Sequence, residues 1–257
     1  MSKAITISLS GHKGGIGKTT TAASLGGILS LSGTQKVLLV DLDPQQNLTT
    51  TFTDGQFEKT VYDAFAQYKA ERHAELPIYN IRENLDIAPA HIRLATVDTD
   101  FASLIGREYM LRRILEPLKE KYDWIFIDCP AQIGCLTANA LMAADKVIIP
   151  MTCDAYSSDG LQQINGFIEN VKMLNEDLDI LGIVVTKYNG RRVVDKNVVD
   201  VLRKEWGSLL FDTAIRENSA IVKAPLMKRD VATYDRTCNG TKDYLALLGE
   251  IVNRVNN

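Results

Sequence analysis

The sequence contains only four cysteines, at positions 129, 135, 153 and 238, and no CxxC pair. These spacings do not fit a zinc finger, and only three histidines are present, so a zinc site is not expected. The sequence also lacks an apolar run of about 20 residues, the length that a membrane-spanning helix needs, and a leader peptide. These absences disfavour secreted, zinc-dependent and membrane-spanning classes. We therefore expect the protein in the reducing cytoplasm, with most of its thiols buried.

A strong charge of either sign is also absent. The formal net charge of −3 does not by itself indicate a protein that binds nucleic acid. Between Lys187 and Lys242, however, 12 Lys and Arg residues stand against 7 Asp and Glu residues. This part of the chain could present a basic face on an otherwise acidic protein. Ordinary solvated helix faces explain the same imbalance, and charge alone favours that interpretation.

The sequence has no Pro-, Gly- or Ser-rich linker and no internal repeat, so we expect one domain over residues 1–257. Short apolar, β-branched runs alternate with helical stretches. Several runs, such as Val37–Val40 and Ile183–Val185, are apolar on both faces, which is typical of parallel strands covered by helices on both sides. The pattern predicts an α/β fold with a doubly wound, mostly parallel sheet that binds its ligand at the carboxyl ends of the strands.

The expected strands and helices alternate along the chain. We expect strands at 4–9, 36–41, 85–88, 124–128, 146–150, 181–186 and about 209–215. We expect helices at 18–31, 107–121, 137–143, 160–175, 194–206 and 241–255. The last helix is amphipathic, but Lys242 and Arg254 are its only basic residues. It is therefore expected to pack on the sheet rather than on a membrane surface.

A glycine-rich segment follows the first expected strand. Residues 11–20 read Gly-His-Lys-Gly-Gly-Ile-Gly-Lys-Thr-Thr. Such a turn between a strand and a helix lets several backbone N–H groups converge on one anion. Its last part, Gly17-Lys18-Thr19, is the end of the phosphate-loop motif, in which the lysine serves the β- and γ-phosphates and the hydroxyl serves Mg²⁺. The segment therefore predicts a nucleotide site.

The loop departs from the standard motif in two ways. The standard motif has glycine at the position of His12, and this chain carries a second lysine, Lys13. Two lysines in one short loop are unfavourable unless something neutralises both. Lys13 could reach the nucleotide of a second protomer, where a cation supplied in trans can raise the rate of phosphoryl transfer by ~10³–10⁵. A solvated lysine beside a glycine turn remains the alternative.

Carboxylates stand at the ends of two further expected strands. Asp41 and Asp43 belong to the segment Asp-Leu-Asp-Pro-Gln, and Asp128 follows the apolar run Ile125–Ile127. Asp128 is the expected carboxylate on the water shell of Mg²⁺, which is held by few protein groups. A carboxylate such as Asp43 can orient the water that attacks the γ-phosphate. Any one aspartate could instead be a helix cap or a turn residue, but the combination with the loop favours the nucleotide site.

Three segments resemble the nucleotide motifs of the ParA/Soj branch of the deviant phosphate-loop ATPases, within the ParA/MinD family. They are His12–Thr20, Val40–Gln45 and Phe126–Pro130, and the likeness runs from about residue 4 to residue 250. The resemblance implies the deviant P-loop NTPase fold, with ATP and Mg²⁺ as cofactors. It also implies an ATPase that partitions plasmid or chromosomal DNA.

In that family, ATP closes a sandwich homodimer that binds DNA non-specifically. A ParB-type centromere-binding protein stimulates ATP hydrolysis and releases the dimer from DNA. The resemblance therefore implies a cytoplasmic, nucleoid-associated protein without stable membrane association.

The resemblance also assigns roles to single residues. Lys13 would act across the dimer, Lys18 on the phosphates, and Asp43 on the attacking water. Asn218 lies where the family's adenine-side loop carries an asparagine, and Asp154 lies where relatives often have a glutamate near the dimer interface. The magnesium site would comprise Thr19, Asp41 and Asp128. The nucleotide would contact Lys13, Gly14, Gly15, Ile16, Gly17, Lys18, Thr19 and Thr20.

This chain departs from the family pattern near its predicted DNA-binding surface. Relatives often read Pro-Arg-Asn where this chain has Arg216-Glu217-Asn218, and Ala220 stands at another frequently basic position. DNA binding is therefore less secure than ATP binding. Ala131 also replaces the second proline of Asp-Cys-Pro-Pro. The basic residues that could compensate on DNA are Arg191, Arg192, Arg216, Lys223, Lys228 and Arg229.

Other functions stay open at this point. An ATPase of the same fold could position a protein cargo on the nucleoid or on a membrane, although the poorly basic last helix disfavours the membrane. A redox protein like the nitrogenase iron protein shares an iron–sulfur cluster between the cysteines of its two subunits. Cys129 and Cys135 lie near Asp128, but burial explains Cys129 more simply. A metabolic ligase of the same fold would not need Lys13.

Overall fold

Seven strands form one sheet in the computed structural model, which describes residues 3–154 and 157–256 and the side chains of all but 157 and 158 among them. The strand order is β3-β4-β2-β5-β1-β6-β7. Only β3, at one edge, runs antiparallel to its neighbour. The strands are β1 (Ile5–Leu9), β2 (Val37–Asp41), β3 (Tyr79–Arg82), β4 (Leu85–Ala88), β5 (Trp124–Asp128), β6 (Lys146–Thr152) and β7 (Asp179–Thr186). The prediction of a doubly wound, mostly parallel sheet is confirmed.

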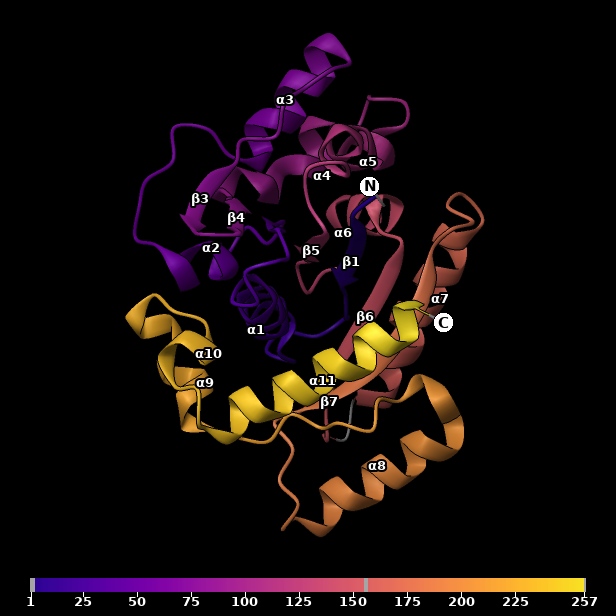
Figure 1. The fold of residues 1–257 in the computed structure, drawn as a ribbon. Coiled ribbons are helices and arrows are strands. Elements are labelled where there is room, and N and C mark those ends of the chain that lie inside the picture. The colour runs from indigo at the N-terminus through magenta and orange to yellow at the C-terminus, as the bar shows by residue number, and fades with distance from the viewer. Residues whose placement is uncertain (1–2, 155–156, 257) are drawn as a thin grey trace.

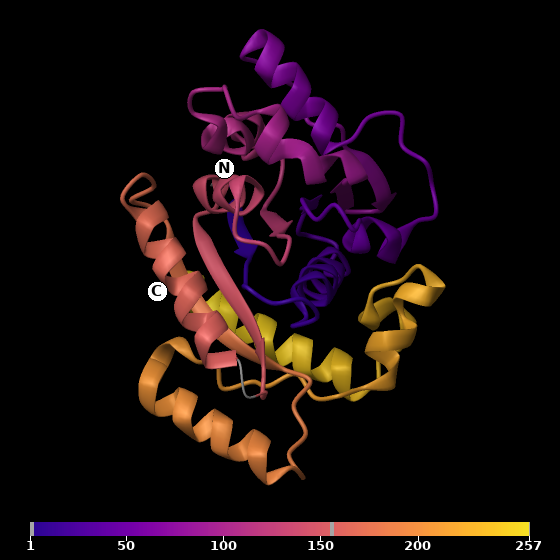
Figure 2. The ribbon, with the colours of Figure 1, turned by 180° about the vertical axis from the view of Figure 1, so that it is seen from behind.

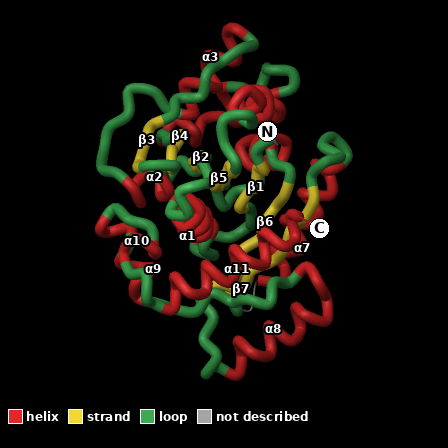
Figure 3. Tube along the Cα trace, viewed as in Figure 1, coloured by secondary structure: helices red, strands yellow, loops and turns green. Residues whose placement is uncertain are grey.

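Helices cover both faces of this sheet (Figure 1, Figure 3). The alternation of side chains along β2 shows how: Val37 and Leu39 belong to one core cluster, and Leu38 and Val40 to another. The helices are α1 (Lys18–Ser30), α2 (Asn47–Phe52), α3 (Val61–Glu71), α4 (Val97–Asp100), α5 (Met110–Leu115), α6 (Cys135–Ala143), α7 (Ser157–Lys172), α8 (Val193–Trp206), α9 (Ser219–Lys223), α10 (Val231–Tyr234) and α11 (Asn239–Asn256).

The two faces carry different helices. Side chains of α1, α10 and α11 fill one core cluster, together with residues such as Leu39 and Phe126. The opposite face carries α3, α5 and α6 over the centre, and α7 and α8 over β6 and β7. Figure 2 shows α7 beside β6 on this second face. The long helix α11 buries Tyr244, Leu247 and Ile251, so the prediction that it packs on the body of the protein is confirmed.

The register of the sheet brings the carboxyl ends of three neighbouring strands level. Leu9 at the end of β1 pairs with Asp128 at the end of β5, and Asp128 in turn pairs with Asp41 at the end of β2. The glycine-rich segment therefore leaves the sheet directly beside two carboxylates. In open α/β sheets, ligands bind in this position.

Two expectations about individual elements were wrong, and one strand was missed. Residues 209–215 do not form a strand: Leu210 makes an isolated bridge with Ile183, and Arg216, just beyond this range, makes another with Tyr188. The expected helix 107–121 is divided into short turns of 3₁₀-helix on either side of α5, the second of which contains Pro117 near its start. The antiparallel strand β3 was not expected, because it is short and only partly buried.

No helix in residues 3–154 and 157–256 is long and apolar enough to cross a membrane.

A buried ion pair joins the edge strand β3, helix α1 and helix α10. Arg82 donates to the carboxylate of Asp230 at 2.7 Å and to the backbone oxygen of Gly27 at 2.9 Å. The Asp230 side chain is fully buried, and its Cγ lies 2.4 Å from the position that a Cβ on Gly27 would take. Glycine is therefore required at this point of α1 by a close approach.

We expect Gly27→Ala to destabilise the protein by about 1–3 kcal/mol, because the added methyl group displaces Asp230 from Arg82. The matched control is Gly249→Ala in α11, where a Cβ meets nothing within 4 Å. There the better helix propensity of alanine should stabilise the protein by up to about 1 kcal/mol. Urea unfolding of both variants measures the difference. Equal effects of the two substitutions would contradict the packing described.

Candidate functional site

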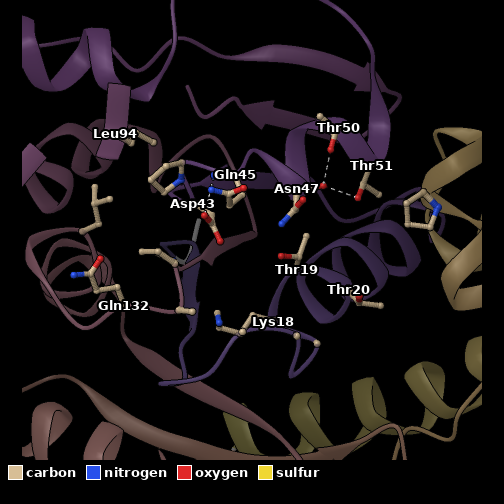
Figure 4. Close-up of a pocket in the computed structure, with 18 of the residues that line it drawn as sticks. Lys18, Thr19, Thr20, Asp43, Gln45, Asn47, Thr50, Thr51, Leu94 and Gln132 are labelled. Atoms are coloured by element: carbon tan, nitrogen blue, oxygen red, sulfur yellow. Dashed lines mark hydrogen bonds between the residues drawn. The ribbon is translucent and has the colours of Figure 1, made fainter. Parts of the chain in front are cut away.

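A cavity of about 1150 Å³ lies at the carboxyl edge of the sheet. Its walls include the glycine-rich loop, the segment Asp43–Asn47, and residues Pro225–Lys228. A second cavity of about 470 Å³ adjoins it and shares Gly17, Thr20 and Lys187 with it. Figure 4 shows Lys18, Thr19 and Asp43 around the larger space. Predicted phosphate-loop residues and Asp43 therefore meet at one site.

The loop is shaped for a ligand that accepts hydrogen bonds. Gly15 and Gly17 have φ values of 74° and 92°, in the left-handed region that favours glycine. Thr186, at the end of β7, donates to the Ile16 oxygen at 2.8 Å and holds the loop from the outside. Helix α1 begins after Gly17 with neither a side-chain cap nor an acidic residue in its first turn. Its first N–H groups are thus open to an anion.

Lys18 is folded back on its own loop. Its Nζ lies 3.1 Å from the Lys13 oxygen and 3.5 Å from the Gly11 oxygen, and the residue is 6% exposed. No carboxylate in the described part of the chain lies within ion-pair distance of this ammonium group. Backbone oxygens stabilise a buried cation less than a paired anion would. The Lys18 side chain is therefore available to a phosphate.

Two buried carboxylates face the loop from β2 and β5. Thr19 Oγ1 donates to Asp128 Oδ2 at 2.6 Å, whereas Asp128 Oδ1 is buried without a hydrogen-bond partner. Asp41 is better satisfied, because its oxygens accept from the Asp43 N–H and from both the N–H and the hydroxyl of Thr49. The unsatisfied oxygen singles out Asp128 as the carboxylate that still needs a partner.

Burial opposes ionisation of both carboxyl groups. Desolvation raises the pKa of Asp41 to about 6, although hydrogen bonds from Thr49 work in the opposite direction. The pKa of Asp128 is raised well above its ordinary value, first by desolvation and then by the charge of Asp41. A cation beside this pair would reverse both effects.

The donor set fits Mg²⁺. The Thr19 hydroxyl and the Asp128 carboxylate are oxygen ligands of the kind that Mg²⁺ prefers, and a nucleotide and water would supply the others. In residues 3–154 and 157–256, no group of three or more His, Cys, Asp and Glu side chains is arranged to hold a metal ion. A metal at this edge would therefore depend on ligands that the nucleotide brings.

Lys13 forms an ion pair within its own chain. Its Nζ lies 2.6 Å from Asp154 Oδ1, and Thr152 donates to the other oxygen of Asp154 at 2.5 Å. Both side chains of the pair are about two-fifths exposed, at 41% and 39%. Exposed pairs of this kind contribute at most about 1 kcal/mol. Lys13 is thus neither a freely solvated lysine nor firmly fixed, and its expected role across a dimer stays a prediction.

Asp43 and Asn218 lie where the sequence predicted but also shape the backbone. Asp43 lines the larger cavity, and its Oδ1 accepts from the Gln45 N–H at 2.9 Å. Asn218 lines the smaller cavity and caps α9 by accepting from the Ala220 N–H at 2.8 Å. Each residue combines the expected position at the site with the turn or cap role that was the alternative.

Three of the six candidate DNA-binding residues are engaged by carboxylates of the same chain. Arg216 pairs with Asp243 at 2.6 Å, Arg192 with Glu217 at 3.1 Å, and Lys228 with Asp54 at 2.6 Å. Asp243 raises the pKa of Arg216. The other three candidates are exposed and make no ion pair with the described carboxylates: Arg191, Lys223 and Arg229. These three are the better candidates for an interaction with phosphate.

The cysteines near Asp128 are explained by packing. Cys129 is fully buried against the hydroxyls of Ser8 and Ser10, and burial raises the pKa of its thiol to about 11. Cys135 is also buried, at the first turn of α6. Cys153 and Cys238 are only partly buried, so the expectation that most thiols are buried holds for half of them.

Sequence reasoning missed two residues of the site. Thr186 ends the strand β7 and Lys187 follows it. Both line the smaller cavity, and Lys187 also lines the larger one. The strand was expected and so was the edge at which it ends, but no motif marks its last residue. The signal that could have found them is position alone, since side chains at the carboxyl ends of parallel strands gather at the ligand.

Comparison with known proteins shows the same motifs in a defined family. A family model described as an AAA domain matches residues 4–180. The sporulation initiation inhibitor protein Soj of Bacillus subtilis is 37% identical over 248 residues, which cover 95% of this chain and 97% of Soj. The chromosome partitioning protein ParA of Caulobacter vibrioides is 35% identical over 257 residues, covering 96% of this chain and 94% of ParA. The chain belongs to the Soj/ParA family.

A solved structure shares the fold across the whole chain. Cobyrinic acid a,c-diamide synthase of Mycobacterium smegmatis, crystallised with ADP and magnesium, aligns with a TM-score of 0.83 and 27% identity. The alignment covers 99% of this chain and 96% of that protein. The deviant P-loop NTPase fold expected for a Soj/ParA chain is thereby confirmed.

The unsatisfied carboxylate of this Soj/ParA chain predicts a variant that is more stable than the natural protein. Without nucleotide or metal, Asp128→Asn should raise the free energy of unfolding by about 1 kcal/mol near neutral pH. A raised carboxyl pKa means that ionisation disfavours the folded state, so the gain should be small near pH 4 and larger near pH 8. The gain should develop as the pH rises from about 4, the ordinary pKa of an aspartate, towards the raised pKa of Asp128 in the folded state.

Urea unfolding of the natural protein and of Asp128→Asn at both pH values measures this gain. Thr19→Val is the matched control, because it removes the donor to Asp128 and should instead destabilise the protein. A loss of stability in Asp128→Asn that does not change with pH would contradict the account.

Proposed function

We propose that this protein is an ATP- and Mg²⁺-dependent partition ATPase that moves plasmid or chromosomal DNA. The observation that supports this most directly is the level arrangement of the glycine-rich loop, Asp41 and Asp128 at one edge of the sheet. The relatives named for chromosome partitioning match almost the whole chain. We further infer that residues 1–257 act as one ATPase domain.

The triphosphate lies in the larger cavity in this proposal. The open N–H groups of Gly14–Thr20 and the Lys18 ammonium bind the phosphates. Thr19 and Asp128 hold Mg²⁺, and Asp41 supports its water shell. The metal, when bound, supplies positive charge to the bridging phosphate oxygens. Asp43 holds the attacking water and accepts its proton as the water oxygen bonds to the γ-phosphorus. The bond between the γ-phosphorus and the β–γ bridging oxygen breaks, so that ADP and phosphate leave, and Asp43 then returns the proton to solvent.

Lys13 connects hydrolysis to dimerisation. In this proposal it leaves Asp154 and contacts the phosphates of the nucleotide in a second copy of the chain. The exposed pair with Asp154 releases the lysine at little cost. The adenine base lies in the smaller cavity beside Asn218. Closing of the dimer on two nucleotides would then bring the exposed basic residues of both copies to one DNA surface.

DNA binding should depend on ATP and on salt. With ATP and Mg²⁺, we expect DNA retention to fall with salt along a log–log slope of about −0.9 for each neutralised phosphate. Arg191→Ala, Lys223→Ala and Arg229→Ala should each reduce that slope by about one unit. The matched comparison is Arg216→Ala. Because the Arg216 side chain already pairs with Asp243, its removal should change the slope less. Binding that is independent of ATP or of salt would contradict the proposal.

Asp43→Ala should bind ATP but hydrolyse it at least about 100-fold more slowly, since a positioned base contributes ~10²–10⁴ in rate. The variant should then accumulate as a dimer in ATP during size-exclusion chromatography. Lys18→Ala, as a control, should bind nucleotide weakly and remain a monomer. A monomeric Asp43→Ala variant with ATP bound would refute the trapped dimer.

The proposal also includes a DNA cargo and a partner protein. We expect a ParB-type centromere-binding protein to stimulate hydrolysis and release the dimer, which would place the protein on the nucleoid. A protein cargo carried on the nucleoid is the remaining candidate, and the two differ in whether a centromere DNA complex or a protein complex accelerates hydrolysis. An amide synthase activity is less supported, because the relative of that name is only 27% identical.

A further inference from the structure

A third lysine lies beside the phosphate loop, directly after a strand that no nucleotide motif includes. Lys187 directly follows Thr186, the last residue of β7 and the residue that holds the loop at Ile16. The Lys187 backbone has a φ of 53°, in the left-handed region. Such conformations are unfavourable for residues with a long side chain and concentrate at functional sites. The unfavourable backbone conformation at Lys187 suggests that the position of its side chain has a function.

The Lys187 ammonium group lies over the glycine turn of the loop. Its Nζ is 3.9 Å from the position that a Cβ on Gly15 would take. Gly15 itself has a positive φ and exposes its backbone to the cavity. Lys187 lines the same cavity as Gly15 and is therefore close to whatever the loop binds.

Lys187 also marks the junction of the two cavities. It lines both the larger space around Lys18 and Thr19 and the smaller space around Asn218. Thr20 and Gly17 line both cavities as well. If a nucleotide places its phosphates in one cavity and its base in the other, then its α-phosphate, the phosphate nearest the ribose, lies at this junction.

The charge of Lys187 is not neutralised within the described part of the chain. No carboxylate of residues 3–154 or 157–256 forms an ion pair with it. Glu217 lines the same cavity but pairs with Arg192. Lys18 carries a second charge at the same site without a carboxylate. Two ammonium groups near one loop repel each other until an anion lies between them.

We propose that Lys187 binds the α-phosphate of the nucleotide and fixes it where the phosphate chain turns towards the ribose. This inference rests on the proposed function, since it assumes that the two cavities hold one nucleotide. Lys187 is then a nucleotide-binding residue of this chain, supplied in cis from β7, in addition to Lys18 from the loop. The strained backbone is retained because it aims the ammonium group at the phosphate.

Competitive displacement of a fluorescent ADP analogue tests the proposal, with ADP, AMP and adenosine as competitors. Lys187→Met should weaken ADP and AMP alike by about tenfold, as the loss of a charged hydrogen bond predicts, and leave adenosine unchanged. Lys187→Arg should retain most of the affinity. The difference between Lys187→Met and the natural protein should shrink at high salt, because screening weakens the interaction of exposed charges.

Two further variants separate binding from folding. Lys121 lies just before β5, at the amino ends of the strands and thus away from the site. The Lys121→Met variant should therefore bind all three competitors normally. Lys187→Gly relieves the left-handed backbone, so its midpoint of thermal unfolding should rise by about 2 °C while ADP and AMP binding weaken. A merely structural lysine would show the opposite, with lower stability and unchanged binding.

The outcomes are distinct. Equal weakening of ADP, AMP and adenosine in Lys187→Met, or no change in any of them, would overturn the assignment of Lys187 while leaving the nucleotide site intact. Weaker ADP with unchanged AMP would overturn the assignment to the α-phosphate. No binding of the ADP analogue by the natural protein would overturn the proposed function itself, and this inference with it.

Discussion

Opposite charges meet at one edge of this sheet without neutralising each other. Asp41 and Asp128 end neighbouring strands at the same level, while the Lys18 ammonium group rests on backbone oxygens of its own loop. One oxygen of Asp128 has no hydrogen-bond partner, and Lys18 has no carboxylate partner among the described residues. A magnesium–nucleotide complex carries both complementary charges, with the metal for the carboxylates and the phosphates for the lysines. The rest of the structure serves to hold this arrangement in place.

The fold builds the arrangement from few constraints. Parallel pairing of β1, β5 and β2 sets the level of the loop and the carboxylates. Thr186 holds the loop from the neighbouring side of the sheet. The buried pair of Arg82 and Asp230 fixes the segment that follows the smaller cavity against α1. The pair of Lys13 and Asp154 at the loop is exposed enough to change partners easily, which is the property that a switch between monomer and dimer requires.

The sequence predicted what periodicity and motifs encode. Continuous apolar runs identified the parallel strands, and the glycine-rich segment with Asp41, Asp43 and Asp128 identified the site. The sequence did not predict which distant residues pair with one another in the folded chain. The strand expected at 209–215 has strand-like residues but only isolated bridges, because tertiary contacts decide whether a ladder forms. Ion pairs of Lys13, Arg216 and Lys228 within the chain could not be foreseen from residues far apart in sequence, nor could the place of Lys187 beside Gly15.

A crystal structure with Mg²⁺ and a non-hydrolysable ATP analogue would test the central claim most directly. The account predicts that Lys18 leaves the oxygens of Gly11 and Lys13 for the phosphates, that the metal lies between Thr19 and Asp128, and that Lys13 leaves Asp154 for the nucleotide of a second copy. A nucleotide-bound single copy in which Lys13 still pairs with Asp154, and Lys18 still rests on its own loop, would contradict it.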